Sequence, residues 1–262
     1  MVFQQGDHVC ALYLTPEEQL TAAVEYIRGG LSRGERCFYV CCEHTLDEFR
    51  AALKRGGIDV EAEEARGAIL LATKDSGHLE GGKFDPDKMI GLLEKTVADA
   101  LNAGFKGLCA AGDMNWVLDG VPGTERLVEY EARLNRFYEA SHALGLCLYN
   151  LKTMPPESID HCLATHKFVR IEGPLLLTNP FYELPEQAFS RTAQPEEVTN
   201  KLQNDLSSVV TRETLPQRHR GLEKCESRSC RKTRLRGMVQ TLESSGADSS
   251  DLTDAVLRFQ AA

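Results

Sequence analysis

Histidine and cysteine, side chains that commonly bind transition metals, occur in or near several predicted strands of this sequence. His8 and Cys10 lie two residues apart in an apolar, strand-like run, so their side chains face the same side. Cys147 lies in another such run, and His166 follows a short helical pattern. These four residues could form a mixed metal or haem site. No Cys-x-x-Cys or His-x-x-x-His spacing accompanies them. The alternative is that the cysteines are buried thiols of the core. We therefore predict neither a metal nor another cofactor.

A second set of residues could bind a small organic ligand. Tyr13, Glu43, Asp113 and Tyr149 each end or directly follow a predicted strand. In a parallel sheet the carboxyl ends of the strands share one edge, and ligands bind there. Trp116, the only tryptophan, lies in the loop after Asp113, and aromatic rings at a cleft mouth suit a small, largely apolar ligand. We predict that these five residues line one crevice, with ordinary packing as the alternative for each aromatic ring.

Glu131 is a further ligand-binding candidate. It lies beside the apolar stripe of a helical pattern near 127–137, which predicts a partly buried carboxylate facing a pocket. The alternative is an ion pair at the edge of that face with Arg133 or Arg136.

The positions of these residues depend on the elements around them. Apolar runs alternate with helical patterns, which indicates a mainly parallel sheet covered by helices on both faces. The predicted strands are 8–13, 37–42, 68–73, 108–112, 146–150 and two short runs within 168–178. The predicted helices follow Thr15, span 45–55, 85–103 and the stretch near 127–137, and begin again at Pro155-Pro156.

The first strand–loop–helix unit has the form of a nucleotide-binding unit without its phosphate loop. Such loops use glycines to bring backbone N–H groups together and a lysine to neutralise charge. Here the loop is Thr15-Pro16-Glu17-Glu18, in which Thr15 is a helix N-cap and Glu18 completes a Thr-x-x-Glu capping box. Two carboxylates at the helix N-terminus disfavour a phosphate there. The crevice is therefore predicted to take a neutral or cationic small molecule.

The chain also resembles a known family. The segment 25–59 is similar to the corresponding segment of RecA/KaiC-type P-loop ATPases, although this chain lacks their phosphate loop. Residues 5–185 resemble the MEDS (methanogen/methylotroph, DcmR-type sensory) family. The matching segments are GDHVCALY (6–13), GERCFYV (34–40), GGKFDPDKM (81–89), GDMNW (112–116), LVEYEARLN (127–135), LCLYN (146–150), THKFV (165–169) and TNPFYE (178–183). The resemblance implies a three-layer RecA-like α/β fold and a cytoplasmic sensor of simple hydrocarbon derivatives. It also implies a signalling partner, either a kinase or a regulator of transcription.

Composition agrees with a soluble protein. The chain is 42% hydrophobic and 26% charged, and it contains no apolar run long enough to cross a membrane. The N-terminus lacks a basic region before an apolar segment, so we expect no secretory signal and a cytoplasmic location. The net charge of -9 disfavours nucleic acid as a partner, apart from weak contact through the basic stretch 212–236.

These observations predict a sensory domain over 1–185 and an appendage over 186–262, with one helix and a basic, partly disordered tail. The predicted function is non-catalytic ligand sensing in signal transduction or transcription. An ATPase with an unorthodox loop and a protein-interaction module with a degenerate cleft are the alternatives. Formation of a homodimer is left open.

Overall fold

The computed structural model describes residues 3–171, 176–184 and 187 of the chain. Within them, seven strands form one sheet in the order β3-β2-β4-β5-β1-β6-β7, and all neighbours are parallel except β6 and β7. The strands are β1 (His8–Tyr13), β2 (Arg36–Cys41), β3 (Ile69–Thr73), β4 (Leu108–Asp113), β5 (Ala143–Asn150), β6 (Phe168–Arg170) and β7 (Leu176–Thr178). The predicted strands are confirmed to within a few residues.

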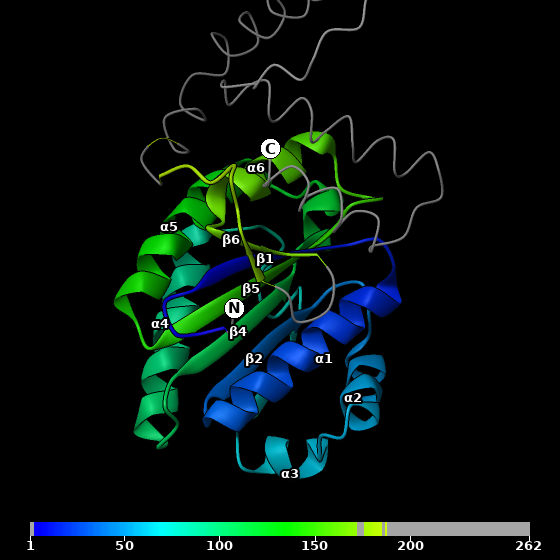
Figure 1. The fold of residues 1–262 in the computed structure, drawn as a ribbon, viewed down its shortest axis with the longest axis vertical. Coiled ribbons are helices and arrows are strands. Elements are labelled where there is room, and N and C mark those ends of the chain that lie inside the picture. Colours follow the sequence, from blue (N-terminus) through cyan, green and yellow to red (C-terminus); the bar gives the residue numbers. More distant parts are fainter. Residues whose placement is uncertain (1–2, 172–175, 185–186, 188–262) are drawn as a thin grey trace, which may run out of the picture.

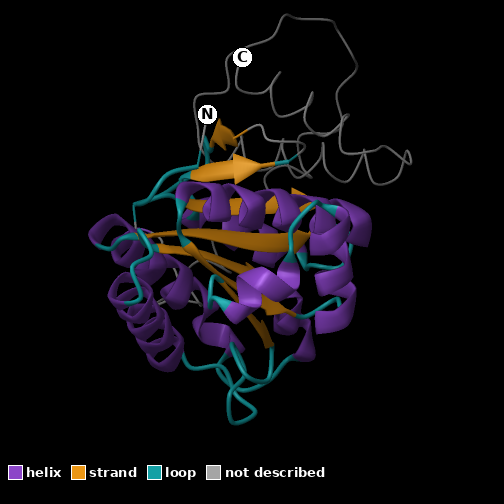
Figure 2. Ribbon diagram, turned by 90° about the horizontal axis from the view of Figure 1, so that it is seen from below, coloured by secondary structure: helices purple, strands orange, loops and turns teal. Residues whose placement is uncertain are grey.

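Helices cover both faces of this sheet (Figures 1 and 2). One face packs against α1 (Pro16–Arg33), α2 (Leu46–Arg55) and α3 (Val60–Ala65). The other packs against α4 (Pro86–Asn102), α5 (Leu127–Ala140) and α6 (Pro156–Thr165), and two 3-10 segments, η1 (Met114–Asp119) and η2 (Thr124–Arg126), connect β4 to α5. The predicted three-layer, mainly parallel α/β fold is confirmed. The short helix α3 was not predicted, because its sequence VEAEEA is too short to show helical periodicity.

The strand alternation assigns each side chain to one helical layer. Along β1, Val9, Ala11 and Tyr13 face α1, whereas Cys10 and Leu12 face the layer of α5. Gly145 in β5 lets α5 approach the sheet, because a Cβ atom there would lie 2.2 Å from Cζ of Tyr138. This close approach places α5 side chains against those of β1 and β5.

Other sequence predictions fall outside the described part of the chain. They are the appendage after 186 (Gln187 apart) and the basic stretch 212–236. Among the described helices, none combines the length and the apolar character that crossing a membrane requires.

Candidate functional site

The loop before α1 satisfies the helix N-terminus with its own side chains, as predicted. Thr15 Oγ1 accepts a hydrogen bond from the Glu18 backbone N–H at 3.2 Å, and Pro16 occupies the first turn. The second half of the predicted capping box is different: Glu18 Oε2 accepts from the N–H of Leu14 at 2.8 Å. Glu17 and Glu18 therefore occupy the position at which a nucleotide fold binds phosphate, and their charge repels an anion there.

Asp113 is fixed at the carboxyl edge by three hydrogen bonds. Its Oδ2 accepts from Gln19 Nε2 at 2.8 Å and from the Glu43 backbone N–H at 2.7 Å, and its Oδ1 accepts from the Asn115 N–H at 3.0 Å. Burial raises the pKa of the Asp113 carboxyl above its usual value, and the two backbone N–H groups oppose that shift. The Asp113 carboxylate therefore holds Gln19 and the backbone of Glu43 and Asn115 in place at this edge of the sheet.

Tyr13 and Glu43 join Asp113 there, as predicted. The Tyr13 hydroxyl donates to Glu43 Oε2 at 3.0 Å, and Asn115 Nδ2 donates to both Tyr13 and Glu43 at 3.0 Å. Glu43 is exposed, so the group opens to solvent. We call Tyr13, Gln19, Glu43, Asp113 and Asn115 the carboxyl-edge cluster.

The carboxyl-edge cluster is rich in hydrogen-bond acceptors. The buried side-chain oxygens Gln19 Oε1 and Asn115 Oδ1 have no hydrogen-bond partner among the described residues. Together with the two carboxylates, they leave this edge with unused acceptors. The chemistry favours a ligand that donates hydrogen bonds or carries positive charge.

Trp116 lies elsewhere, and its predicted place at a cleft mouth is wrong. Its side chain is 0% exposed and packs on the opposite face of the sheet, with its ring 4.4 Å from Phe84 and 5.2 Å from His78. The 3-10 segment η1 turns the chain across the end of β4, so Met114 and Trp116 reach the other layer while Asn115 stays with Tyr13 and Glu43.

Tyr149 is also separated from Tyr13, contrary to the expectation of one crevice. Tyr149 pairs in register with Leu12, while Tyr13 pairs with Asn150. Because side chains alternate along a strand, this register turns the two tyrosines to opposite faces. Tyr149 is 0% exposed and donates its hydroxyl proton to Glu131 Oε1 at 2.6 Å.

Glu131 is fully buried, so the predicted partly buried carboxylate at a pocket is wrong, and so is the alternative of a surface ion pair. Its Oε2 lies 3.3 Å from His8 Nε2, 3.5 Å from His166 Nε2 and 3.8 Å from Cys147 Sγ. Arg133 instead pairs with Asp87 and Glu129. We call His8, Glu131, Cys147 and His166 the buried His–Glu–Cys cluster.

Charges in this cluster are interdependent. Burial alone raises the pKa of Glu131, but His166, His8 and the Tyr149 hydroxyl outweigh it and lower that pKa to about 2. Burial, reinforced by the Glu131 charge, raises the pKa of the Cys147 thiol well above its ordinary value. Burial also lowers the pKa of His166 to about 3, so at neutral pH this imidazole is uncharged and lies near a protonated thiol.

Three of the four residues suggested for a Cys/His site are therefore brought together, and Cys10 is not among them. Cys10 Sγ donates to the Phe168 carbonyl at 3.7 Å and belongs to a neighbouring group with Cys162 and His166. Sequence reasoning missed Gln19, Asn115, Asn135 and Cys162. Only Asn115 had a local signal, since it lies two residues after Asp113 and its N–H bonds that carboxylate.

His78 adds a buried titratable group beside Trp116. Its Nδ1 has no hydrogen-bond partner among the described residues, and it borders a small cavity of about 20 Å³, room for one water molecule. Burial lowers the pKa of His78 from 6.5 to about 4, and the negative charge of Glu131 only partly opposes this. Because the folded pKa is lowered, His78 contributes stability above pH 6.5 that is lost as the pH falls toward 4.

A His78→Leu variant is expected to lose this pH dependence. As the pH falls from 6.5 to 4, the parent should lose about 3 kcal/mol of unfolding free energy relative to the variant. Urea unfolding across this range measures it. Parallel pH profiles of the two proteins would contradict the burial of a neutral His78.

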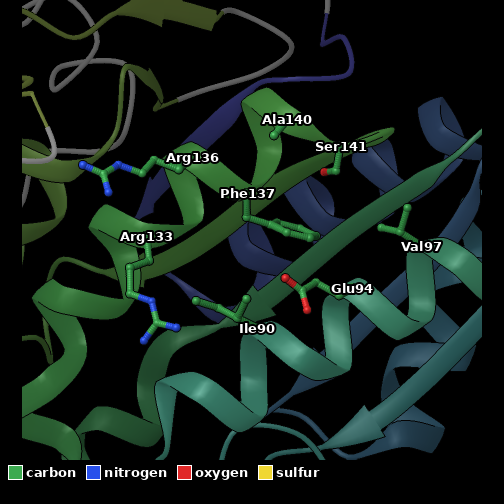
Figure 3. Close-up of a pocket in the computed structure, with 8 residues that line it drawn as sticks. All are labelled: Ile90, Glu94, Val97, Arg133, Arg136, Phe137, Ala140 and Ser141. Atoms are coloured by element: carbon green, nitrogen blue, oxygen red, sulfur yellow. The ribbon is translucent and has the colours of Figure 1, made fainter.

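A groove lies on the surface between α4 and α5 (Figure 3). It has a volume of about 510 Å³ and combines apolar side chains with charged ones. Its lining is Ile90, Glu94, Val97, Arg133, Arg136, Phe137, Ala140 and Ser141. It lies in the helical layer rather than at the sheet edge, so it is separate from the carboxyl-edge cluster.

One family model matches more than half of the chain. A sequence model described as "MEthanogen/methylotroph, DcmR Sensory domain" (MEDS) matches residues 7–167. The transcriptional repressor DcmR of Methylorubrum extorquens is 25% identical over 162 residues, which cover 62% of this chain and 58% of that protein. A solved structure, the KaiC-like protein PH0186 of Pyrococcus horikoshii, is 17% identical with a TM-score of 0.46, over 64% of this chain and 71% of that one.

Proposed function

Because the chain belongs to the MEDS family of sensory domains, we propose that it is a non-catalytic, cytoplasmic ligand sensor. Its ligand is a small neutral or cationic molecule, such as a simple hydrocarbon derivative with a hydroxyl or amino group. The ligand binds at the carboxyl-edge cluster and controls a partner in transcription or signal transduction. A relative matched over 58% of its length is a transcriptional repressor, which supports a regulatory output.

The observation that carries this proposal is the set of side chains at the carboxyl edge of the sheet, which does not suit a phosphate. Where a nucleotide-binding unit presents backbone N–H groups and a lysine, this chain presents Glu17 and Glu18 at a helix N-terminus already capped by Thr15. Asp113, the last residue of β4, is already bonded to three donors. These contacts favour a binding site over phosphoryl transfer.

The hydrogen-bond acceptors of the carboxyl-edge cluster explain why the ligand should be a hydrogen-bond donor or a cation. A donor group placed near Glu43 would meet a carboxylate that faces solvent, and behind it the unpaired oxygens of Gln19 and Asn115. An ammonium or hydroxyl group can satisfy these oxygens, whereas a carboxylate or phosphate cannot. Tyr13 is only 2% exposed, and its hydroxyl is already committed to Glu43.

A panel of small probes tests the proposal. Methylammonium and methanol are expected to bind in ligand-observed NMR, and acetate and ATP to show no binding by NMR or calorimetry at the same ionic strength. A Glu43→Gln variant keeps an acceptor for Tyr13 but loses the charge, so methylammonium should bind up to about fivefold more weakly.

The matched control is Glu139→Gln, an exposed carboxylate at the far end of α5, which should leave binding unchanged. Micromolar binding of ATP would favour the enzyme alternative instead. Equal methylammonium affinity in parent and Glu43→Gln would place the ligand elsewhere, and the groove between α4 and α5 would be tested next.

A further inference from the structure

The buried His–Glu–Cys cluster collects four side chains from four separate parts of the fold. His8 comes from β1, Glu131 from α5, Cys147 from β5 and His166 from the residue that follows α6. All are between 0% and 6% exposed. Their ligand atoms lie within 4.8 Å of one another. They therefore form one group in the interior, which shares no residue with the surface groove or with the carboxyl-edge cluster.

The hydrogen bonds around the two imidazoles fix where their protons are. His166 Nδ1 lies 2.8 Å from the carbonyl oxygen of Cys162, so Nδ1 carries a proton and donates it. His8 Nδ1 lies 3.2 Å from Asn135 Oδ1. Asn135 is held in this orientation because its Nδ2 donates to the carbonyls of Glu131 and Thr165. Both histidines therefore use Nδ1 as the donor to a fixed oxygen.

This arrangement turns both Nε2 atoms toward Glu131. In the neutral imidazole, each Nε2 then carries a lone pair that faces a carboxylate oxygen, at 3.3 Å for His8 and 3.5 Å for His166. The His166 Nε2 atom is buried and has no hydrogen-bond partner among the described residues. Lone pairs that converge on a carboxylate in a buried site are stabilised by a positive charge between them.

The distances suit a metal ion in the middle of the group. Bonds of about 2.0–2.3 Å from a tetrahedral ion to N, O and S ligands separate the ligand atoms by about 3.3–3.8 Å. Four of the six separations between these ligand atoms are 3.3, 3.5, 3.5 and 3.8 Å. Glu131 Oε1, the oxygen not used, accepts the Tyr149 hydroxyl proton at 2.6 Å, as ligating carboxylates commonly do.

We propose that His8, Glu131, Cys147 and His166 bind one divalent transition-metal ion, with Zn²⁺ the best match to two imidazoles, a carboxylate and a thiolate. The four protein ligands leave no open position, so the ion is structural and not catalytic. It joins β1 and β5 to α5 and to the segment that leads into β6. On binding, the Cys147 thiol gives up its proton to solvent and becomes the thiolate ligand.

Metal titration of the full chain tests the site. Cys225 and Cys230 are first changed to serine, so that thiols of the basic stretch cannot bind the probe. Protein stripped with a chelator and incubated with Zn²⁺ should retain one ion per chain after gel filtration, measured by mass spectrometry of the metal, and should melt at a higher temperature. With Co²⁺, a thiolate-to-metal charge-transfer band and the intense visible bands of a four-coordinate ion are expected.

Variants of three buried thiols then locate the ion. Cys147→Ser should remove the charge-transfer band and weaken Zn²⁺ binding by more than about 100-fold, beyond the effect of altering a supporting residue. Cys10→Ser and Cys162→Ser are the matched controls and should keep the band. Loss of the band in these controls, with retention in Cys147→Ser, would move the ion to the neighbouring group and overturn the proposal.

The parent protein decides the question even if Cys147→Ser does not fold. A parent that retains no Zn²⁺, or that binds Co²⁺ without a charge-transfer band, would overturn the site.

Discussion

A Trp116→Ala variant is expected to lose about 3–5 kcal/mol of unfolding free energy, the usual cost of removing a buried large aromatic side chain. Trp116 is 0% exposed and lies against the rings of Phe84 and His78. These contacts connect the η1 segment to the loop between β3 and α4, and alanine would leave a cavity there. Urea unfolding followed by circular dichroism measures the loss.

Leu118→Ala is the control for this variant, because Leu118 lies in the same 3-10 segment but is 45% exposed. It should cost less than about 0.5 kcal/mol, as surface changes do. Under conditions in which Trp116→Ala remains folded, its affinity for methylammonium should equal that of the parent. If Trp116→Ala were as stable as the parent but bound methylammonium more weakly, Trp116 would belong to the ligand site.

Replacement of Glu131 by leucine is expected to cost a similar 3–5 kcal/mol in chelator-treated protein, because it removes one partner from a buried charged network. Leucine fills most of the volume but accepts no hydrogen bond. The Tyr149 hydroxyl and the two histidine Nε2 atoms would remain buried without the carboxylate that they contact. Urea unfolding at neutral pH again provides the measurement.

Two variants calibrate this effect. Tyr149→Phe removes a single hydrogen bond to a charged acceptor and should cost about 1.5–3 kcal/mol. Glu139→Leu changes an exposed carboxylate on the same helix and should have little effect. If Glu131→Leu were as stable as Glu139→Leu, the carboxylate would not be the centre of a paired network.

Local sequence patterns determined most of the architecture. Continuous apolar runs separated by helical stripes predict a buried parallel sheet, because both faces of each strand must be covered. Thr15, Pro16 and Glu18 identified the start of α1 from capping chemistry alone. The convergence of Tyr13, Glu43 and Asp113 followed from a general property of parallel sheets, since their strand ends share an edge.

Only the tertiary structure decided which face each side chain occupies and which distant residues meet. The register of β1 against β5 pairs Leu12 with Tyr149 and thereby separates Tyr13 from Tyr149, which the sequence could not show because a shift of one residue reverses every side chain. The same register places His8 beside Cys147, 139 residues away, and the close approach of α5 over Gly145 brings Glu131 to both. Strand pairing and helix packing are long-range interactions, so the spacing of these residues along the chain carried no sign of the cluster that they form.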